Sequence, residues 1–500
     1  MSGKVREKRK PTFFLALLPI LSMVVLIGGG YAIFGLNVEV LILASTAIAA
    51  IVAVYLGYTW NDIMDSIVNK LSKSLPAMFI LLTVGFLIGT WMIGGTIPMM
   101  VYYGLKIINP SFLIITAFLV TAAVSICTGT SWGSAGTIGV ALMGIASSLG
   151  APLPIVAGAV VSGAYFGDKM SPMSDTTNLA PIAAGSKLYD HIGHMFWTTL
   201  PGAVICCVVY TIAGMNFSGS AENTSEKVTI ILNTLDQVFS FNPLMLLPVI
   251  MVLYGSIRKI PTIPVMLLSS AIAMLNGVLF NGFEVADCFE AAVTGFSLEM
   301  IHIEGFDTAN LIPDVAKLLE RGGLHSMLST FLLTLCAYGF AGALSVTGSL
   351  DIVLNKVMKS VKSTFGIIAA TIASCLVCEC VTCNGKLSIL IPGEMFHNTY
   401  VKRGLEPRNL SRTLEDAATM TETLIPWTAA GVYMATTLGV PTLGYLPWAI
   451  LNYSGIIFAL ILAATGIGIM KIKKGSDSWE EYVSLNKADG VDVECLEGAK

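Results

Sequence analysis

Thr128-Gly-Thr-Ser-Trp-Gly-Ser-Ala-Gly-Thr137 interrupts a long apolar run in the first half of the chain. A simple lipid-facing helix has no need for so many small and polar residues. Irregular backbone at membrane depth is tolerated only where protein covers it or where it lines a wet cavity. The stretch therefore predicts an interior site or a re-entrant hairpin, with a tight helix-packing face of small residues as the alternative.

The chain around this break is too apolar for a soluble protein. Hydrophobic residues make up 55% of the 500 residues and charged residues only 12%, against roughly a quarter charged in soluble proteins. Apolar runs of about twenty residues recur, and each can cross a hydrocarbon core as a helix. Because lipid cannot satisfy an open backbone, we expect an all-α polytopic membrane protein. The expected spans lie near residues 12–34, 38–57, 76–104, 111–127, 152–167, 190–213, 242–256, 262–282, 325–349, 364–381, 424–439 and 445–471, with polar connections at 216–236 and 284–322.

Basic residues at the two ends predict the topology. One group precedes the first apolar run and another follows the last, namely Lys4, Arg6, Lys8, Arg9 and Lys10, then Lys471, Lys473 and Lys474. Both termini are therefore expected to be cytoplasmic, with an even number of spans in a bacterial inner membrane. We divide the chain into an N-terminal segment (1–11), one transmembrane domain (12–474) and a cytoplasmic tail (475–500). The net charge of −4 gives no sign of a nucleic-acid partner.

A polar motif occurs twice in the same order. Thr130-Ser-Trp-Gly133 precedes Asp168-Lys-Met-Ser-Pro-Met-Ser-Asp175-Thr176, and Thr382-Cys-Asn-Gly385 precedes Glu415-Asp-Ala-Ala-Thr-Met-Thr-Glu422-Thr423. Aligned on Met173 and Met420, Asp168 matches Glu415 and Asp175 matches Glu422. These motifs predict repeat-like halves at about 38–213 and 262–470. Duplicated halves with interrupted helices are the usual plan of secondary transporters, which bind their substrate at mid-membrane.

The acidic side chains of these motifs are the candidate site. An ionised carboxylate between apolar segments is costly, so its presence argues for function. A dehydrated carboxylate holds a proton until a cation replaces it, and a site that binds either ion is an exchanger. Side-chain and carbonyl oxygens suit a small hard cation, here Na⁺ at Asp175, with no other metal expected. The candidate residues are Thr130, Ser131, Gly133, Ser134, Asp168, Ser171, Ser174, Asp175, Thr176, Asn178, Thr382, Asn384, Lys386, Glu415, Asp416, Glu422 and Thr423.

Other interpretations of the polar residues remain open. The acidic residues could instead lie in loops or pair with Lys169, Arg408 and Arg412. Glu379 also lies in an apolar run and is a further candidate proton carrier, unless it pairs with Lys386. Cys375, Cys378, Cys380 and Cys383 suit tight helix packing better than a soft-metal site. No nucleophile and base arrangement or cofactor loop occurs, so we expect no enzyme and no cofactor beyond the coupling ions Na⁺ and H⁺.

The stretch Ser162-Gly-Ala-Tyr-Phe-Gly-Asp168-Lys-Met-Ser-Pro-Met-Ser-Asp175-Thr-Thr-Asn178-Leu-Ala-Pro181 resembles the signature region of NhaC-type Na⁺/H⁺ antiporters. Ile391-Pro-Gly-Glu394 and Pro407-Arg-Asn-Leu-Ser-Arg412 are similar to that family as well, and the resemblance covers about residues 12 to 470. It implies the ion transporter superfamily, with inverted repeats, paired re-entrant hairpins and an elevator-like movement. The same family includes exchangers of malate for lactate, so the resemblance leaves the substrate open.

One departure from the family pattern bears on the substrate. An acidic residue and a Gln are expected before the Leu-Ser of the second hairpin, but this chain has Asn384-Gly385-Lys386. A lysine there could replace a coupling cation or attract an anionic substrate. Our first hypothesis is Na⁺/H⁺ exchange, with Asp175 and Glu422 as principal carboxylates and Asp168 and Asp416 in support. The alternative functions are exchange of a small organic anion or an amino acid, and passive conduction by a channel. The expected partners are the lipid bilayer and a small ion or solute, and a homodimer is left open.

Overall fold

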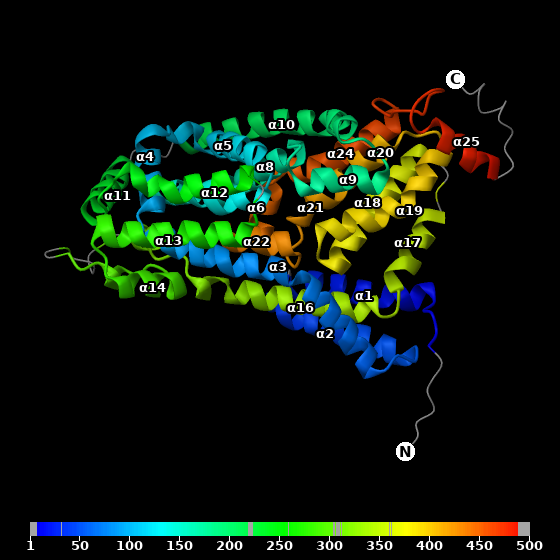
Figure 1. Ribbon diagram of the computed structural model, residues 1–500, viewed down its shortest axis with the longest axis horizontal. Helices are drawn as coiled ribbons and strands as arrows, with labels where there is room; N and C mark the ends of the chain where they lie inside the picture. Colours follow the sequence, from blue (N-terminus) through cyan, green and yellow to red (C-terminus); the bar gives the residue numbers. More distant parts are fainter. Residues whose placement is uncertain are drawn as a thin grey trace, which may run out of the picture.

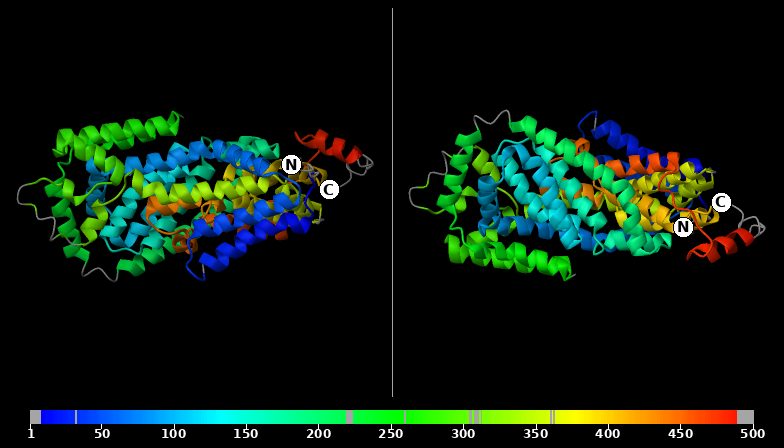
Figure 2. Two further views of the ribbon diagram at one scale, coloured as in Figure 1. Left: turned by 90° about the horizontal axis from the view of Figure 1, so that it is seen from below. Right: turned by 90° about the horizontal axis from the view of Figure 1, so that it is seen from above.

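The computed structural model is a bundle of helices that run mostly along one long axis (Figures 1 and 2). It describes residues 8–488 except 32, 219–223, 259, 304–305, 307–310, 312, 360 and 362. Lys4 and Arg6 of the predicted N-terminal segment and the last part of the predicted tail lie outside the described residues. Within the described residues, 7 helices are long and apolar enough to cross a membrane, or up to 9 if each of 2 bent pairs is one span. The chain is an all-α polytopic membrane protein.

Two hairpins and two broken helices form the centre of the bundle. The first hairpin joins α5 (Leu113–Thr128) to an arm made of α6 (Ser131–Ser134), a π-helical segment and α7 (Val140–Ser148). The second hairpin joins α18 (Thr364–Thr382) to α19 (Gly385–Lys402). The first broken helix is α8 (Leu153–Met170) followed by α9 (Asp175–Ala184). The second is α20 (Pro407–Leu414), a π-helical segment and α21 (Met420–Glu422), followed by α22 (Ala429–Leu438).

These elements recur along the chain at a constant interval. The arm from 131 to 148 in the first half has the same length as α19 from 385 to 402. Likewise α9 and α22 each have 10 residues, and each ends at a left-handed glycine, Gly185 and Gly439, with φ of 71° in both. The interval that separates these glycines also separates Gly129 from Cys383. The two halves therefore share the order and the length of these helices.

This interval corrects the pairing that the sequence suggested. It makes Asp168 the counterpart of Glu422, whereas the motif alignment paired Asp168 with Glu415 and Asp175 with Glu422. The alignment was displaced by about two helical turns. The error arose because the second broken helix carries two acidic positions with similar neighbours, Glu415 and Glu422, whereas the caps and glycines that fix the register differ in residue type.

The two hairpins enter the bundle from opposite ends. In Figure 1, α5, α6 and α8 lie to the left of the centre, whereas α18 and α19 lie to the right. Each hairpin also packs against the outer half of the other half's broken helix, since α19 contacts α9 and the first hairpin's arm contacts α22. The tips of both hairpins therefore meet near the middle of the long axis.

The remaining helices surround this centre, and the sequence misplaced some of them. The expected span 76–104 is instead a 34-residue helix, α3 (Trp60–Ile93), and a separate α4 (Thr96–Ile107). A capping box at Thr59 and Asp62 starts α3 early, and Gly95, with φ of 76°, divides it from α4. The others are α1 (Phe13–Val25), α2 (Val38–Tyr55), α10 (Leu188–Ser218), α11 (Thr224–Val238), α12 (Leu247–Ile257), α13 (Thr262–Asn281), α14 (Val285–Thr294), α15 (Pro313–Leu319), α16 (Leu328–Ser345), α17 (Ser349–Lys359), α23 (Thr442–Tyr445), α24 (Ile450–Thr465) and α25 (Trp479–Ala488).

Three further expectations about the spans are corrected. The polar connection expected at 216–236 is largely helix, because α10 continues to Ser218 and α11 begins at Thr224. The expected spans 152–167 and 424–439 are each only one half of a broken helix. The start of α1 and the helix α25 lie at the same end of the long axis (Figures 1 and 2).

Candidate ion-binding site

The tip of the first hairpin is a sharp, glycine-dependent turn. Gly129 ends α5 in the left-handed region with φ of 67°, and a Cβ there would lie 2.9 Å from Cβ of Met173 in the broken helix. Thr130 then starts the arm, because its hydroxyl accepts a hydrogen bond from the Gly133 amide at 3.3 Å. The Ser134 hydroxyl donates to the Thr130 carbonyl at 2.8 Å. The segment from Thr128 to Thr137 thus forms the tip of a hairpin, which is one of the two arrangements that the sequence predicted.

The second tip repeats this geometry with different residues. Cys383 occupies the left-handed position with φ of 55° and is the one described non-glycine residue with positive φ. The Asn384 side chain starts α19 by accepting a hydrogen bond from the Leu387 amide at 3.1 Å. The Ser388 hydroxyl donates to the Asn384 carbonyl at 3.1 Å. Different side chains therefore build the same capped turn, which exposes helical amides at the start of each arm.

Each tip holds one carboxylate from the broken helix of its own half. The Ser131 hydroxyl donates to Oδ2 of Asp168 at 2.7 Å, and the Gly385 amide donates to Oε1 of Glu422 at 3.1 Å. Ser131 and Gly385 are the first residues of the two arms, where amides are unsatisfied and the helix dipole favours negative charge. Asp168 is 5% exposed, and Glu422 is partly buried. The structure therefore places one acidic residue that the sequence proposed at each hairpin tip.

Asp175 lies in a different environment from the one expected. Its side chain is 67% exposed and its Oδ2 lies 2.5 Å from Nζ of Lys386, which is 57% exposed. The expectation of a dehydrated carboxylate at Asp175 is therefore wrong. Asp175 is the first residue of α9, after the break, and so lies beyond the tip that seats Asp168. Lys386 pairs with Asp175, whereas the sequence had considered Glu379 as its partner.

Asp416 belongs to a buried ion pair. Its Oδ1 contacts Nζ of Lys169 and accepts a hydrogen bond from the Thr198 hydroxyl at 3.0 Å. Arg412 is also near, with Nε 3.9 Å from Oδ2 of Asp416. The interpretation that an acidic residue pairs with Lys169 and Arg412 is thus confirmed for Asp416.

Its neighbour Glu415 is 0% exposed, and neither of its carboxyl oxygens has a hydrogen-bond partner among the described residues.

The remaining polar candidates mostly stabilise the breaks. The Ser171 hydroxyl donates to the Ile126 carbonyl at 2.9 Å, which ties the first break to α5. Ser174 caps α9 through the Thr177 amide and shares a 3.0 Å hydrogen bond with Thr176. The Asn178 amide donates to the Pro172 carbonyl at 2.9 Å. The other two hydroxyls likewise make short-range or interhelical bonds, Thr382 to the Asn384 carbonyl and Thr423 with Tyr445.

Two features near the tips were outside the predicted site. Trp132 follows Ser131 and stacks on Tyr433 of α22, with ring centroids 4.4 Å apart. Glu379 lies in α18 and is 0% exposed, and a Cβ on Gly385 would lie 3.6 Å from its Oε1. The acid within an apolar run was a visible signal for Glu379. Nothing in the sequence indicated that Trp132 would contact the other half.

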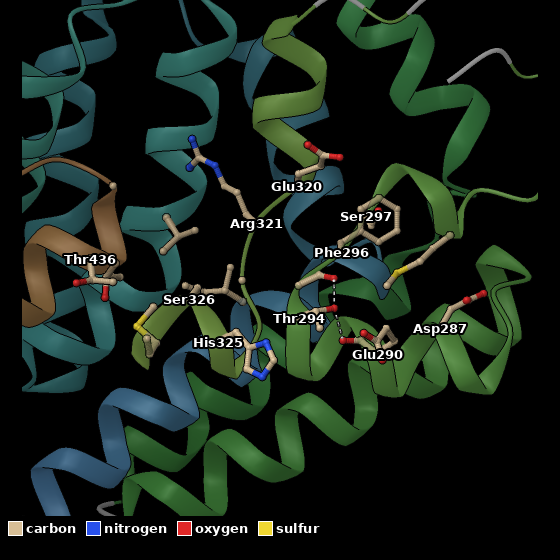
Figure 3. A pocket seen from close by; sticks show the side chains of 18 of the residues that line it. Asp287, Glu290, Thr294, Phe296, Ser297, Glu320, Arg321, His325, Ser326 and Thr436 are labelled. Carbon is tan, nitrogen blue, oxygen red and sulfur yellow. Dashed lines mark hydrogen bonds between the residues drawn. The ribbon is translucent and has the colours of Figure 1, made fainter. Parts of the chain in front are cut away.

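A pocket of about 990 Å³ is lined in part by residues of α14, a helix at the end of the bundle opposite α25 in Figure 1. Val140, Thr436 and Gly439, from α7 and the end of α22, line it from within the bundle. Figure 3 shows ionisable side chains from α14 and from the segment before α16 around it. These are Asp287, Glu290, Glu320, Arg321 and His325. None of the predicted site residues lines this pocket.

Comparison with known proteins identifies the family. Residues 163–467 match the model of the Na⁺/H⁺ antiporter family. The chain is 54% identical to an uncharacterized Na⁺/H⁺ antiporter of Haemophilus influenzae, over 93% of this chain and 98% of the relative. It is 37% identical to the Na⁺/H⁺ antiporter NhaC of Alkalihalophilus pseudofirmus, over 93% of this chain and 98% of the relative. It is 32% identical to the malate-2H⁺/Na⁺-lactate antiporter of Bacillus subtilis, over 92% of this chain and 96% of the relative. These relatives are named as transporters, and the protein is a transporter and not an enzyme. The chain belongs to the Na⁺/H⁺ antiporter family, on the NhaC branch that the sequence resembled.

Proposed function

We propose that this protein exchanges Na⁺ for H⁺ across the membrane, with Asp168 and Glu422 as the principal carboxylates. The observation that carries the proposal is that each hairpin tip seats one acidic side chain, through Ser131 and through the Gly385 amide. A carboxylate removed from bulk water is stabilised either by a proton or by a cation. Competition between the two ions for the same oxygens couples their movement without any organic cofactor.

Alternating access is the proposed mode of movement. The opposed entry of the two hairpins supports an inverted repeat, and their contacts with the outer halves of the broken helices support movement as one unit. The pocket beside α22 supports access from the end opposite α25. In this scheme the hairpins and broken helices carry the ions past the surrounding helices, as in an elevator. The membrane is proposed to be a bacterial inner membrane, with both termini in the cytoplasm.

Exchange of a small organic anion is the second candidate function. The exposed Lys386 at the second tip favours it, because a lysine beside the ion site can bind a carboxylate. One relative is named as a malate-2H⁺/Na⁺-lactate antiporter. In this case Na⁺ and H⁺ would accompany the organic solute, and Lys386 would leave Asp175 when the solute binds.

Purified protein in liposomes separates these functions. An imposed Na⁺ gradient should drive a change of internal pH in the absence of organic solutes, whereas a K⁺ gradient should not. The measurement is repeated with malate, lactate or amino acids inside the vesicles. If Na⁺ alone moves no protons and one of these solutes restores proton movement, the second function replaces the first. Passive Na⁺ conductance without proton movement would instead indicate a channel.

A further inference from the structure

We infer that Glu379 and Glu422 form a carboxyl pair that shares one proton and releases it when Na⁺ binds. The inference rests on the proposed Na⁺/H⁺ exchange and assigns its proton to a particular pair of residues. It adds Glu379 to the site and gives the second hairpin a role that the first lacks. Four observations support it.

Glu379 is a buried acid without a structural partner. Its side chain is 0% exposed, and neither carboxyl oxygen has a hydrogen-bond partner among the described residues. Its backbone carbonyl accepts the 2.9 Å hydrogen bond from the Cys383 amide that closes the tip. An unsatisfied buried carboxylate is costly, so a residue with only a packing role would not be acidic here.

The Glu379 and Glu422 side chains converge on the same side of the tip. A Cβ built on Gly385 would lie 2.6 Å from Oε2 of Glu422 and 3.6 Å from Oε1 of Glu379. Because both oxygens lie near the same point, they are no more than about 6 Å apart, at the outer limit of the distance over which one carboxylate opposes the ionisation of another. Two such groups in a dry setting retain one proton between them. Glu422 is only partly buried and so gives ions a route to the pair.

The first hairpin shows that the fold itself needs no acid at this position. The counterpart of Glu379 is Ser125, whose hydroxyl donates to the Ala164 carbonyl at 2.6 Å. The counterpart of Glu422 is Asp168, which is held by Ser131. The first half therefore has one carboxylate at its tip and the second half has two, on the same backbone geometry.

The lysines that flank the site form ion pairs with acidic residues other than Glu379 and Glu422. Lys386 pairs with Asp175, and Lys169 pairs with Asp416. Among the described residues, no salt bridge involves Glu379 or Glu422. Apart from the Gly385 amide, which donates to Glu422, a proton or a bound cation is the means of compensating the charge of the pair.

Other ionisable groups face the pair and define the setting of any titration. Lys386, Asp168, Asp175 and Tyr165 lie on the Glu422 side. Tyr338 of α16 lies close to Glu422 as well. Four thiols are near Glu379: those of Cys375, Cys378 and Cys380 on α18, and that of Cys383 just after its end. Lys70 of α3 is close to Cys378 and Cys383.

Proton release on addition of Na⁺ tests the pair directly. Detergent-purified protein in a weakly buffered solution with a pH dye receives NaCl, with KCl as the ionic-strength control. Wild type should acidify the solution on Na⁺ addition, and Glu379→Gln and Glu422→Gln should each reduce the release at least tenfold. Glu379→Asp, which keeps a carboxyl group, should restore part of it. Glu394→Gln, an exposed glutamate on α19, is the matched control and should behave as wild type.

The pH dependence of Na⁺ affinity gives an independent readout. Competition for one proton predicts that the apparent Kd for Na⁺ rises about tenfold per pH unit on the acid side of the titration. This slope should flatten in Glu379→Gln. Infrared difference spectra of wild type should also lose a protonated-carboxyl band when Na⁺ is added, which keeps the inference testable if the Gln variants fail to fold.

The outcomes separate this inference from the proposed function. If wild type exchanges Na⁺ for H⁺ in vesicles but Glu379→Gln keeps the wild-type proton release and slope, the pair is refuted and the proposed function stands. Absence of the infrared band change in an active wild type refutes the pair in the same way. If wild type neither exchanges Na⁺ for H⁺ nor releases protons, the proposed function fails first and the pair with it.

Discussion

Lys386 and Asp175 join the second hairpin to the outer half of the first broken helix, with Nζ and Oδ2 2.5 Å apart. The two residues come from opposite halves of the chain, and both side chains are more exposed than buried. The lysine thus occupies the carboxylate that the sequence proposed as the main Na⁺ ligand. The ammonium group of Lys386 therefore competes with any other cation that approaches the Asp175 carboxylate.

Lys386→Gln should therefore raise the apparent affinity for Na⁺ severalfold if the protein exchanges Na⁺ for H⁺. Because an exposed ion pair contributes only about 0–1 kcal/mol, the thermal unfolding midpoint should hardly change. Na⁺-driven proton movement in liposomes at several Na⁺ concentrations measures the effect. Lys402→Gln, at the other end of α19, is the control. Loss of all transport in Lys386→Gln, with organic-solute exchange present in wild type, would favour the second function.

The sequence predicted the class of fold well because its signals were physical and local. Long apolar runs, the Gly-Ser-Thr break at Thr128 to Thr137 and the repeated polar motifs all correspond to features of the structure. The register of the repeat could not be predicted, because equivalent positions in the two halves share a backbone conformation but differ in residue type. Gly129 and Cys383 share a left-handed turn, and Ser131 and Gly385 share a donor role, without any identity between them.

The burial of individual acidic side chains could not be predicted from the sequence either. Asp175 and Asp168 occur in one motif, yet one is 67% exposed and the other 5% exposed. The difference depends on which side of the helix break each residue occupies, and the break is set by the Ser174 cap. The sequence named Lys169 as a possible partner of an acidic residue, but spacing alone did not reveal that this residue would be Asp416.

Asp168→Asn should abolish exchange, and Ser131→Ala should weaken it. A hydrogen bond to a charged group contributes about 1.5–3 kcal/mol, so loss of the Ser131 donor should weaken the interaction with a charged Asp168 by tenfold or more. Exchange in liposomes across a range of Na⁺ concentrations and pH values measures both variants. Ser147→Ala, near the other end of the same arm, should match wild type. Full activity in Asp168→Asn would contradict the proposed site.

Gly385→Ala should reduce exchange at least tenfold while the protein remains folded. The added methyl group would lie 2.6 Å from Oε2 of Glu422 and must displace that carboxylate from the Gly385 amide. Gly193→Ala on α10 is the control, because its methyl group would meet nothing within 4 Å and alanine there should stabilise the helix by about 0.4–1 kcal/mol. Unfolding midpoints and transport rates are measured together. Unchanged transport in Gly385→Ala would show that Glu422 does not need this amide.

Substitution of the two left-handed tip residues should be costly at Gly129 and nearly neutral at Cys383. Gly129→Ala introduces a Cβ 2.9 Å from that of Met173 and forces a residue other than glycine into the left-handed region, at about 1–2 kcal/mol for the backbone alone. Cys383→Gly relieves the same conformation, and so it should keep transport and change stability little. Thermal unfolding in detergent and transport in liposomes check both. A stable, active Gly129→Ala would mean that the first tip rearranges without cost.

The buried pair Lys169 and Asp416 provides the last test, because it separates support of the fold from a role in ion binding. Removing one partner leaves a buried charge uncompensated, so Lys169→Met should destabilise the protein by about 3–5 kcal/mol. The double variant Lys169→Met with Asp416→Leu should recover much of that loss, and a double-mutant cycle of unfolding free energies measures the coupling. If Asp416 only holds α8 against the second broken helix, the double variant should also recover Na⁺/H⁺ exchange. Recovered stability without exchange would instead place Asp416 among the ion-binding residues, as the sequence first suggested.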